Sequence, residues 1–317
     1  PEESAGRLMA KEFVTVPLEW TVGQAIDYMR ASRDLPDDFY DLYVVDKELS
    51  PLGVLPVSRV MRSKRGVSIE TIMSTDLHIV APDLNQEDLA YEFRQYNLSS
   101  APVATPEAGM VGVVTLDDIV RVIDEEAEDD LFKMAGLGAE DMYSRALQTA
   151  RSRFPWLTVN LATAILASLV ISMFDQTIER LVALAVLMPI VASMGGNAGT
   201  QTLTVAVRAI AMKDLTSANA LRFIGKEIFV AVINGAGFAA LAAIVTLFWF
   251  GDSMLAMVIA IAMVGNLLVA GLAGALIPLI LERLNIDPAN ASAVILTTIT
   301  DIVGFFAFLG LASWLLL

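Results

Sequence analysis

The sequence predicts a multidomain protein in which an α/β soluble half is followed by an all-α membrane domain of five helices. The chain of 317 residues is 56% hydrophobic, and its mean hydropathy of +0.61 is too high for a soluble protein of this size. The charges are divided unevenly. Residues 1–133 hold 26 acidic and 12 basic side chains, whereas the remainder holds 10 and 9. An acidic soluble half therefore precedes a nearly neutral membrane half.

The first 127 residues alternate short strands with helices. Residues 41–46 and 53–57 are short apolar runs of the kind that form buried strands. Residues 21–30 predict a helix, because the side chain of Thr21 can cap its first free N–H groups. The same order recurs roughly 60 residues later, which indicates an internal repeat. Its expected strands are residues 77–80, 101–104 and 110–114, and its expected helices are residues 85–95 and the stretch from Leu116 onward.

Two motifs in the second repeat resemble a known family. Ile72-Met73-Ser74 opens the repeat and Gly112-Val113-Val114-Thr115-Leu116-Asp117-Asp118 closes it. With these motifs the repeats are similar to a tandem pair of CBS domains, which we place at residues 1–65 and 66–116. The resemblance implies that Thr115 and Asp118 contact a nucleotide such as ATP, although the first repeat has Pro56 at the position of the hydroxyl. Thr115 could equally cap the following helix.

Residues 117–134 are the most acidic stretch and predict one continuous connecting helix. Residues 124–130 hold six acids in seven positions, and like charges four residues apart each disfavour a helix by about 0.2–0.5 kcal/mol. A divalent cation held between this helix and a facing acidic surface would reverse the repulsion, and such a weak, wet site suits Mg²⁺. The alternative is a solvated charged face. The candidate ligands for a regulatory metal are Asp83, Asp88, Asp117, Asp118, Glu125, Glu128 and Asp129.

The membrane half, residues 154–317, contains five apolar segments that are each long enough to span a bilayer. They are residues 154–174, 181–207, 228–251, 253–281 and 288–317. Residues 135–153 precede them and are expected at the membrane surface as a juxtamembrane segment. By the positive-inside rule, the soluble half is cytoplasmic and the C-terminus is outside. The basic residues that decide this are Arg145, Arg151, Arg153, Arg208, Lys213, Arg222, Lys226 and Arg283, against Arg180 on the other side.

Asp301 is the only ionisable side chain between Pro288 and Leu317. A carboxylate at this depth costs about 2.5–3.5 kcal/mol on insertion scales, so its presence indicates function. Thr297 and Gly304 lie on the same helical face, and this polar, small-residue stripe suits a watery path. The alternative is a buried ion pair, for which no other apolar segment offers a central Lys or Arg.

The second apolar segment carries Pro189 and the run Met194-Gly195-Gly196-Asn197-Ala198-Gly199-Thr200-Gln201. Proline and glycines weaken a helix, so we expect irregular backbone whose freed carbonyls, with the Asn197 amide, accept hydrogen bonds from the waters of a cation. Close helix packing through Gly195 and Gly199 is the other interpretation. Packing alone does not account for Asn197 and Gln201.

These two stretches, together with Asp287-Pro288-Ala289, make the chain similar to the MgtE family of magnesium channels. The resemblance runs from the CBS pair to the C-terminus, and without the family's helical N-terminal domain the sequence is expected to be a truncation or a short member. It implies a homodimer in a bacterial-type inner (plasma) membrane, with Mg²⁺ as substrate and regulator. Residues 117–134 would be the plug helix that shuts the pore. The pore residues would be Asp301, Asn197, Gly195, Gly196 and Thr297.

Oxygen ligands and the reluctance of Mg²⁺ to lose water favour passage of the hydrated ion. Two other functions stay open: a proton- or sodium-coupled divalent cation exporter, and a membrane-anchored nucleotide sensor that transports nothing. The sequence shows neither a paired nucleophile and base nor a phosphate-binding loop, so we expect no enzyme. The net charge of −15 disfavours nucleic acid as a partner, and the lack of cysteine excludes disulfides and thiolate metal sites.

Overall fold

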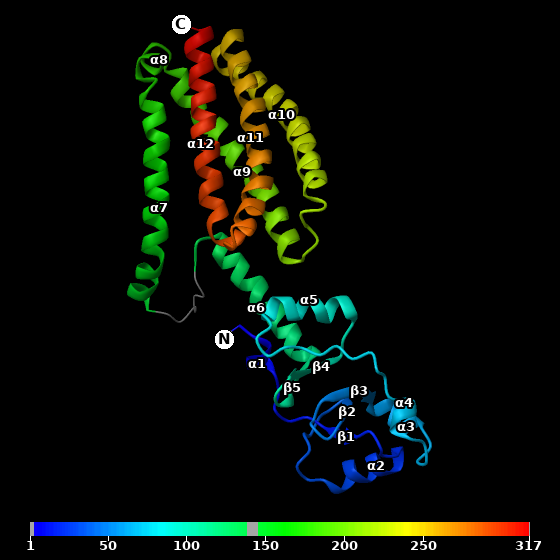
Figure 1. The fold of residues 1–317 in the computed structure, drawn as a ribbon. Coiled ribbons are helices and arrows are strands. Elements are labelled where there is room, and N and C mark those ends of the chain that lie inside the picture. Colours follow the sequence, from blue (N-terminus) through cyan, green and yellow to red (C-terminus); the bar gives the residue numbers. More distant parts are fainter. Residues whose placement is uncertain (1–2, 138–144, 317) are drawn as a thin grey trace. The chain divides into compact units, whose positions relative to one another are not determined.

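The computed structural model describes residues 3–137 and 145–316. The chain divides into two compact units, Pro1–Ala127 and Glu128–Leu317. The elements of both units are labelled in Figure 1. The first unit is the predicted α/β half and contains two lobes, and the second is all-helical.

The first lobe is built on a three-stranded sheet. Strand β1 (Thr15–Pro17) pairs in parallel with β2 (Asp41–Val45), and β2 pairs antiparallel with β3 (Pro51–Pro56). Helix α2 (Val22–Ala31) begins as predicted, because Thr21 and Gln24 form a reciprocal capping box. The lobe also contains the short helices α3 (Val57–Arg62) and α4 (Ile69–Ile72).

The second lobe repeats this plan with fewer strands. It contains α5 (Gln86–Tyr96) and the antiparallel pair β4 (Ser100–Thr105) and β5 (Gly109–Thr115). The strand predicted at residues 77–80 is wrong: of these residues only Val80 makes a bridge, a parallel one to Val103. Helix α1 (Ala5–Leu8) belongs to this lobe, because Ala5 packs in the core that contains Val80 and Leu89. Residues 5–8 therefore pack with the second repeat rather than the first.

Polar and apolar contacts join the two lobes. The Tyr43 hydroxyl lies 2.5 Å from Ser100 Oγ, and Ser100 Oγ donates to Asp41 Oδ2 at 2.6 Å. Burial raises the pKa of Tyr43 well above its ordinary value, although its hydrogen bond with Ser100 opposes the shift. Around this contact Tyr43, Met110 and Val113 form a small buried cluster. The repeats consequently fold as one unit.

Helix α6 (Leu116–Met134) is the predicted continuous acidic helix. It ends where the sequence supplies a glycine with positive φ, Gly136 (φ 70°). The Gly136 N–H donates to the Lys133 carbonyl and the Leu137 N–H donates to the Phe132 carbonyl, which is the Schellman pattern of a helix C-terminus. The end of α6 is thus fixed by backbone hydrogen bonds.

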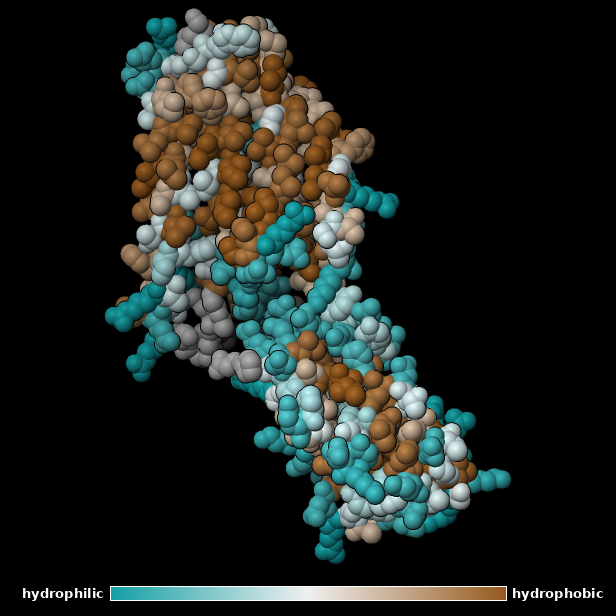
Figure 2. Space-filling view, viewed as in Figure 1, coloured by the Kyte–Doolittle hydropathy of each residue, from teal (hydrophilic) through white to brown (hydrophobic). Residues whose placement is uncertain are grey.

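The second unit contains five helices that are long and apolar enough to cross a membrane, as predicted. They are α7 (Ala146–Ser172), α9 (Ala183–Ala211), α10 (Ala220–Phe250), α11 (Ser253–Arg283) and α12 (Pro288–Leu315), with the short α8 (Asp175–Arg180) after α7. Helix α7 begins at Ala146, inside the segment expected as juxtamembrane. Hydrophobic side chains cover the middle of this unit, and hydrophilic ones gather towards its ends (Figure 2). Such a surface fits a lipid surrounding.

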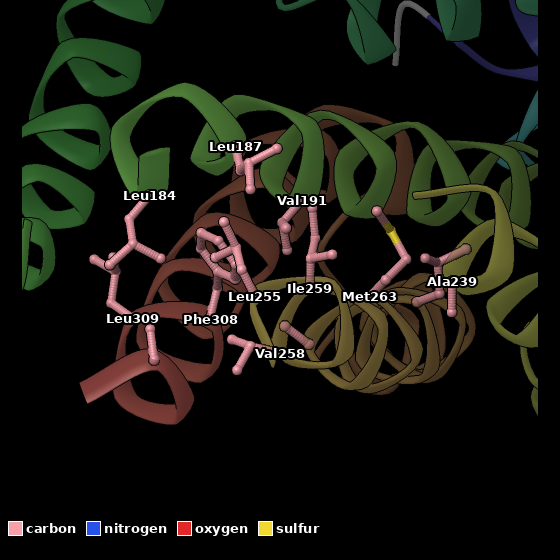
Figure 3. Close-up of a cluster of buried hydrophobic side chains, with 13 residues drawn as sticks. Leu184, Leu187, Val191, Ala239, Leu255, Val258, Ile259, Met263, Phe308 and Leu309 are labelled. Carbon is pink, nitrogen blue, oxygen red and sulfur yellow. The ribbon is translucent and has the colours of Figure 1, made fainter. Parts of the chain in front are cut away.

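Helices α9, α11 and α12 form the centre of the helical unit. Leu184, Leu187 and Val191 from α9 meet Ile259 from α11 and Phe308 from α12 (Figure 3), and all five side chains are fully buried. Helix α9 runs without interruption through Pro189 and the glycines. The expected irregular backbone is therefore wrong, because contacts with α11 and α12 hold this stretch helical from both sides.

Candidate ion-conducting site in the helical unit

Asp301 lies in the middle of α12 and is half-buried. Among the residues that the structure describes, no side chain or backbone group makes a hydrogen bond or an ion pair with its carboxylate. The buried ion pair that the sequence left open is thus not formed within these parts of the chain. A partly accessible, unpaired carboxylate in an apolar helix can attract a cation or the water shell of one.

The hydroxyl groups of the threonines that precede Asp301 donate hydrogen bonds to backbone carbonyls of α12 itself. The hydroxyl of Thr297 donates to the carbonyls of Ala293 and Val294, both at 3.1 Å, and the hydroxyl of Thr300 donates to Thr297 O at 3.1 Å. Each hydroxyl uses its proton inside the helix, so its oxygen lone pairs stay available. Thr297 is half-buried, like Asp301 one turn later.

Asn266 of α11 is the residue that reasoning from the sequence missed. It is fully buried, and its Nδ2 donates to Val191 O of α9 at 2.8 Å. A Cβ on Gly195 would lie 2.2 Å from Asn266 Nδ2, and one on Gly304 would lie 2.8 Å from the same atom. The amide therefore fits between a glycine of α9 and a glycine of α12. A single amide in the long apolar run of α11 was the available signal.

This contact divides the predicted pore residues into two groups. Gly195 and Gly304 are buried against Asn266, so Gly304 is a packing position rather than part of an open path. Gly199 packs on Leu296, which confirms the close-packing interpretation of the Gly195/Gly199 pair. Asn197 and Gln201 are exposed, and Gly196 has open space where a Cβ would lie. The side chain of Asn197 donates weakly to Ser193 Oγ, at 3.4 Å.

The end of α6 is bound to the start of α12. Lys133 Nζ lies 2.9 Å from Asp287 Oδ2 and 2.7 Å from Asp129 Oδ2. Asp287 also caps α12, because its Oδ1 accepts from the Ala289 N–H at 2.9 Å. Burial lowers the pKa of Lys133, but its bonds to Asp129 and Asp287 outweigh this and hold the pKa above its ordinary value. Lys133 is charged at physiological pH and joins the acidic helix to the helix that carries Asp301.

The predicted regulatory acids lie on several elements. Asp83, Asp117, Glu125 and Glu128 are exposed and Asp88 is half-exposed, while Asp129 binds Lys133. Within residues 3–137 and 145–316 of one chain, no three acids or histidines form a group that could hold a metal ion. A metal site built from these acids would therefore need ligands from another chain or water between more distant side chains.

Thr115 and Asp118 are brought together at the start of α6. Asp118 Oδ2 accepts from the Thr115 hydroxyl at 2.8 Å and from the Thr115 N–H at 3.3 Å, and Asp118 Oδ1 accepts from Arg121 Nη2 at 2.7 Å. Asp118 thus accepts from the N–H of Thr115 just before α6, as the third residue of a helix does in a capping box. The Thr115 hydroxyl itself donates to Asp118, so a cap formed by the Thr115 oxygen stays a prediction.

Two family models match the chain. The MgtE model, described as a divalent cation transporter, matches residues 188–311. This range contains the glycine stretch of α9, Asn266 and Asp301. The CBS domain model matches twice, at residues 5–66 and 69–125.

Two relatives match almost the whole chain. The magnesium transporter MgtE of Bacillus subtilis (strain 168) is 31% identical over 99% of this chain and 70% of its own length. The protein of the same name from Enterococcus faecalis is 34% identical over 98% of this chain and 69% of its own length.

Two solved structures match part of the chain. The soluble part of a magnesium transporter is 32% identical with a TM-score of 0.38, and it aligns with 40% of this chain and 50% of its own. The cytosolic domain of the Mg²⁺ channel MgtE in complex with ATP is 30% identical with a TM-score of 0.37, over 38% and 49%. Together with the relatives matched over nearly the full chain, the two family models show that this chain belongs to the MgtE family of divalent cation transporters.

Proposed function

We propose that the chain transports Mg²⁺ across a membrane, with Asp301 as the residue that attracts the ion. The observation that carries this proposal is the half-buried carboxylate of Asp301, which has no partner among the described residues and lies within the matched family segment. The relatives named above are magnesium transporters. Because Mg²⁺ gives up water reluctantly, Asp301 would bind it through its water shell.

The proposal includes a homodimer in the plasma membrane, with the soluble unit in the cytoplasm and the C-terminus outside. Helix α7 is consistent with a partner subunit or lipid along most of its length, because only 6% of its apolar stretch is buried by the rest of the chain. In a dimer, two Asp301 carboxylates facing one axis would favour a divalent ion over a monovalent one. Asn197, Gly196 and Thr297 would line the same path.

The proposal also includes regulation of transport by cytoplasmic Mg²⁺. Mg²⁺ held by the acids of α6 and the soluble unit would favour a closed arrangement, and Lys133 would transmit the position of α6 to α12 through Asp287. ATP binding at Thr115 and Asp118 stays a prediction from the resemblance.

The experiment is Mg²⁺ uptake by vesicles that contain the purified chain, driven by a membrane potential without a second ion gradient. Wild type should take up Mg²⁺, and Asp301→Asn should reduce uptake to the level of empty vesicles, because it removes the charge at nearly constant size. Glu179→Gln, an exposed acid of α8, is the matched control and should behave like wild type. Uptake that required a proton or sodium gradient would favour the coupled exporter instead. Uptake by Asp301→Asn at the wild-type rate would contradict the proposal.

A further inference from the structure

A second carboxylate is buried in the helical unit, away from the middle of α12. Glu227 of α10 is 7% exposed. Its Oε2 accepts a hydrogen bond from Thr202 Oγ1 of α9 at 3.0 Å, and Thr202 is itself buried. In the sequence, Glu227 stands just before the third apolar segment, residues 228–251.

The ion pair available to Glu227 is weak. Lys226 Nζ lies 3.5 Å from Glu227 Oε1, and the Lys226 side chain is 67% exposed. An ammonium group in solvent at this distance contributes little, whereas a carboxylate removed from water needs a well-placed cation or several hydrogen bonds. Among the described residues, Glu227 accepts one close hydrogen bond from a neutral group, that of Thr202, and this bond does not meet the need.

A cavity of about 140 Å³ adjoins Glu227 between α9, α10 and α11. Its polar lining consists of Glu227, Thr202, Gln201 and Asn234, and Ala198 and Gly271 are among the small residues that leave the space open. Gln201 and Asn234 are exposed, so the cavity is accessible from outside the bundle. The volume has room for several waters.

We propose that this cavity is a second binding site for hydrated Mg²⁺ in the membrane unit. Its donors are all oxygen, which hard cations prefer. A single carboxylate with neutral oxygens around a roomy cavity matches the way Mg²⁺ binds proteins, through one or two carboxylates and several retained waters. Glu227 supplies the charge, and Thr202, Gln201 and Asn234 accept hydrogen bonds from the retained waters. The choice of ion rests on the proposed function.

The chain has no cysteine, so one introduced thiol reports on the cavity. Ala198→Cys places that thiol in the lining, and its rate of reaction with a small, water-soluble thiol reagent is measured in the full chain with and without Mg²⁺. At a Mg²⁺ concentration about tenfold above the dissociation constant, protection should slow the reaction about tenfold. The same thiol with Glu227→Gln should react at one rate under both conditions.

Two comparisons separate this site from the others. Leu221→Cys, on the exposed side of α10 and outside the lining, should react at a rate that Mg²⁺ does not change. In the Asp301→Asn background, protection of Ala198→Cys should persist even though transport is lost. Protection that survives Glu227→Gln, disappears with Asp301→Asn, or occurs equally at Leu221→Cys would overturn the proposal. If wild type transported no Mg²⁺ but the thiol were still protected, the proposed function would fail while the proposed binding site would hold. The two failures are therefore distinguishable.

Discussion

The side-chain amide of Asn266 donates a 2.8 Å hydrogen bond to the backbone carbonyl of Val191, and this bond joins α11 to α9 next to Gly195. The oxygen of the same amide, Asn266 Oδ1, is buried and has no hydrogen-bond partner among the described residues. Asn266 also packs on Gly304, three residues after Asp301. The position of the proposed ion-binding helix therefore depends on a residue from a different helix.

Alanine at Gly195 should destabilise the helical unit, whereas alanine at Gly196 should not. The new Cβ at Gly195 would lie 2.2 Å from Asn266 Nδ2, but at Gly196 it would meet open space. Overpacking typically costs about 1–3 kcal/mol, while replacing glycine in a helix gains up to about 1 kcal/mol. Thermal unfolding in detergent should give a lower Tm for Gly195→Ala than for wild type. Equal Tm values for the two variants would contradict the packing described here.

The contact between Asn266 and Gly195 predicts non-additive effects. Asn266→Ala removes the hydrogen bond to Val191, and interhelical hydrogen bonds in membranes average about 0.6 kcal/mol, so its cost from this bond should be modest. It also opens the space that a Cβ on Gly195 requires. Gly195→Ala should therefore lower Tm less in the Asn266→Ala background than alone. A double-mutant cycle of unfolding measurements tests this, and strict additivity would count against direct contact.

Loss of the Lys133–Asp287 pair should weaken closure by internal Mg²⁺. Lys133→Met removes the charge and keeps much of the side chain, and Asp287→Asn removes the partner charge but keeps a residue that caps helices well. Both side chains are 30–39% exposed, and such pairs contribute at most about 1 kcal/mol. Each variant should raise the Mg²⁺ concentration of half-closure by up to about fivefold in patch recordings. The double variant should match either single one, and a shift equal to the product of the two would exclude coupling through this pair.

Neutralising Glu125, Glu128 and Asp129 together should leave transport active at high internal Mg²⁺. Without these charges, the cation has fewer carboxylates to bridge, and the closed arrangement loses its stabilisation. Neutralising only Glu125 and Glu128 keeps the pair between Asp129 and Lys133, and so separates loss of metal binding from loss of that pair. Glu107→Gln with Glu70→Gln, two acids away from α6, serves as a charge control. Normal closure of the triple variant would remove α6 from the regulatory proposal.

The sequence predicted most elements because their signals are local. Thr21 and Gln24 cap α2 through neighbours three residues apart, and Gly136 ends α6 through hydrogen bonds within five residues. The strand expected at residues 77–80 does not form, because only Val80 pairs, in one bridge to Val103, and no ladder of hydrogen bonds follows. The local pattern could not show which partner strand was available.

The proposed site was only partly predictable. Asp301 is conspicuous because a charge in a long apolar run is costly, and that cost can be estimated from the sequence. Asn266 and Glu227 gave weaker signals, since one amide in a helix and one acid at its edge are both common. Their importance comes from what lies against them: Gly195 and Gly304 around Asn266, and Thr202 with the cavity around Glu227.

The sequence by itself determined that an acidic α/β unit precedes five membrane helices, and that the last helix carries an isolated carboxylate. Hydropathy and charge follow the order of residues along the chain, so these features need no knowledge of distant contacts. Only the tertiary structure decided that Ala5 packs with the second repeat, that α9 stays helical through Pro189, and that Asn266 lies between two glycines. Such outcomes depend on the register in which distant elements pack, and close packing fixes that register through the shapes of side chains from several elements at once.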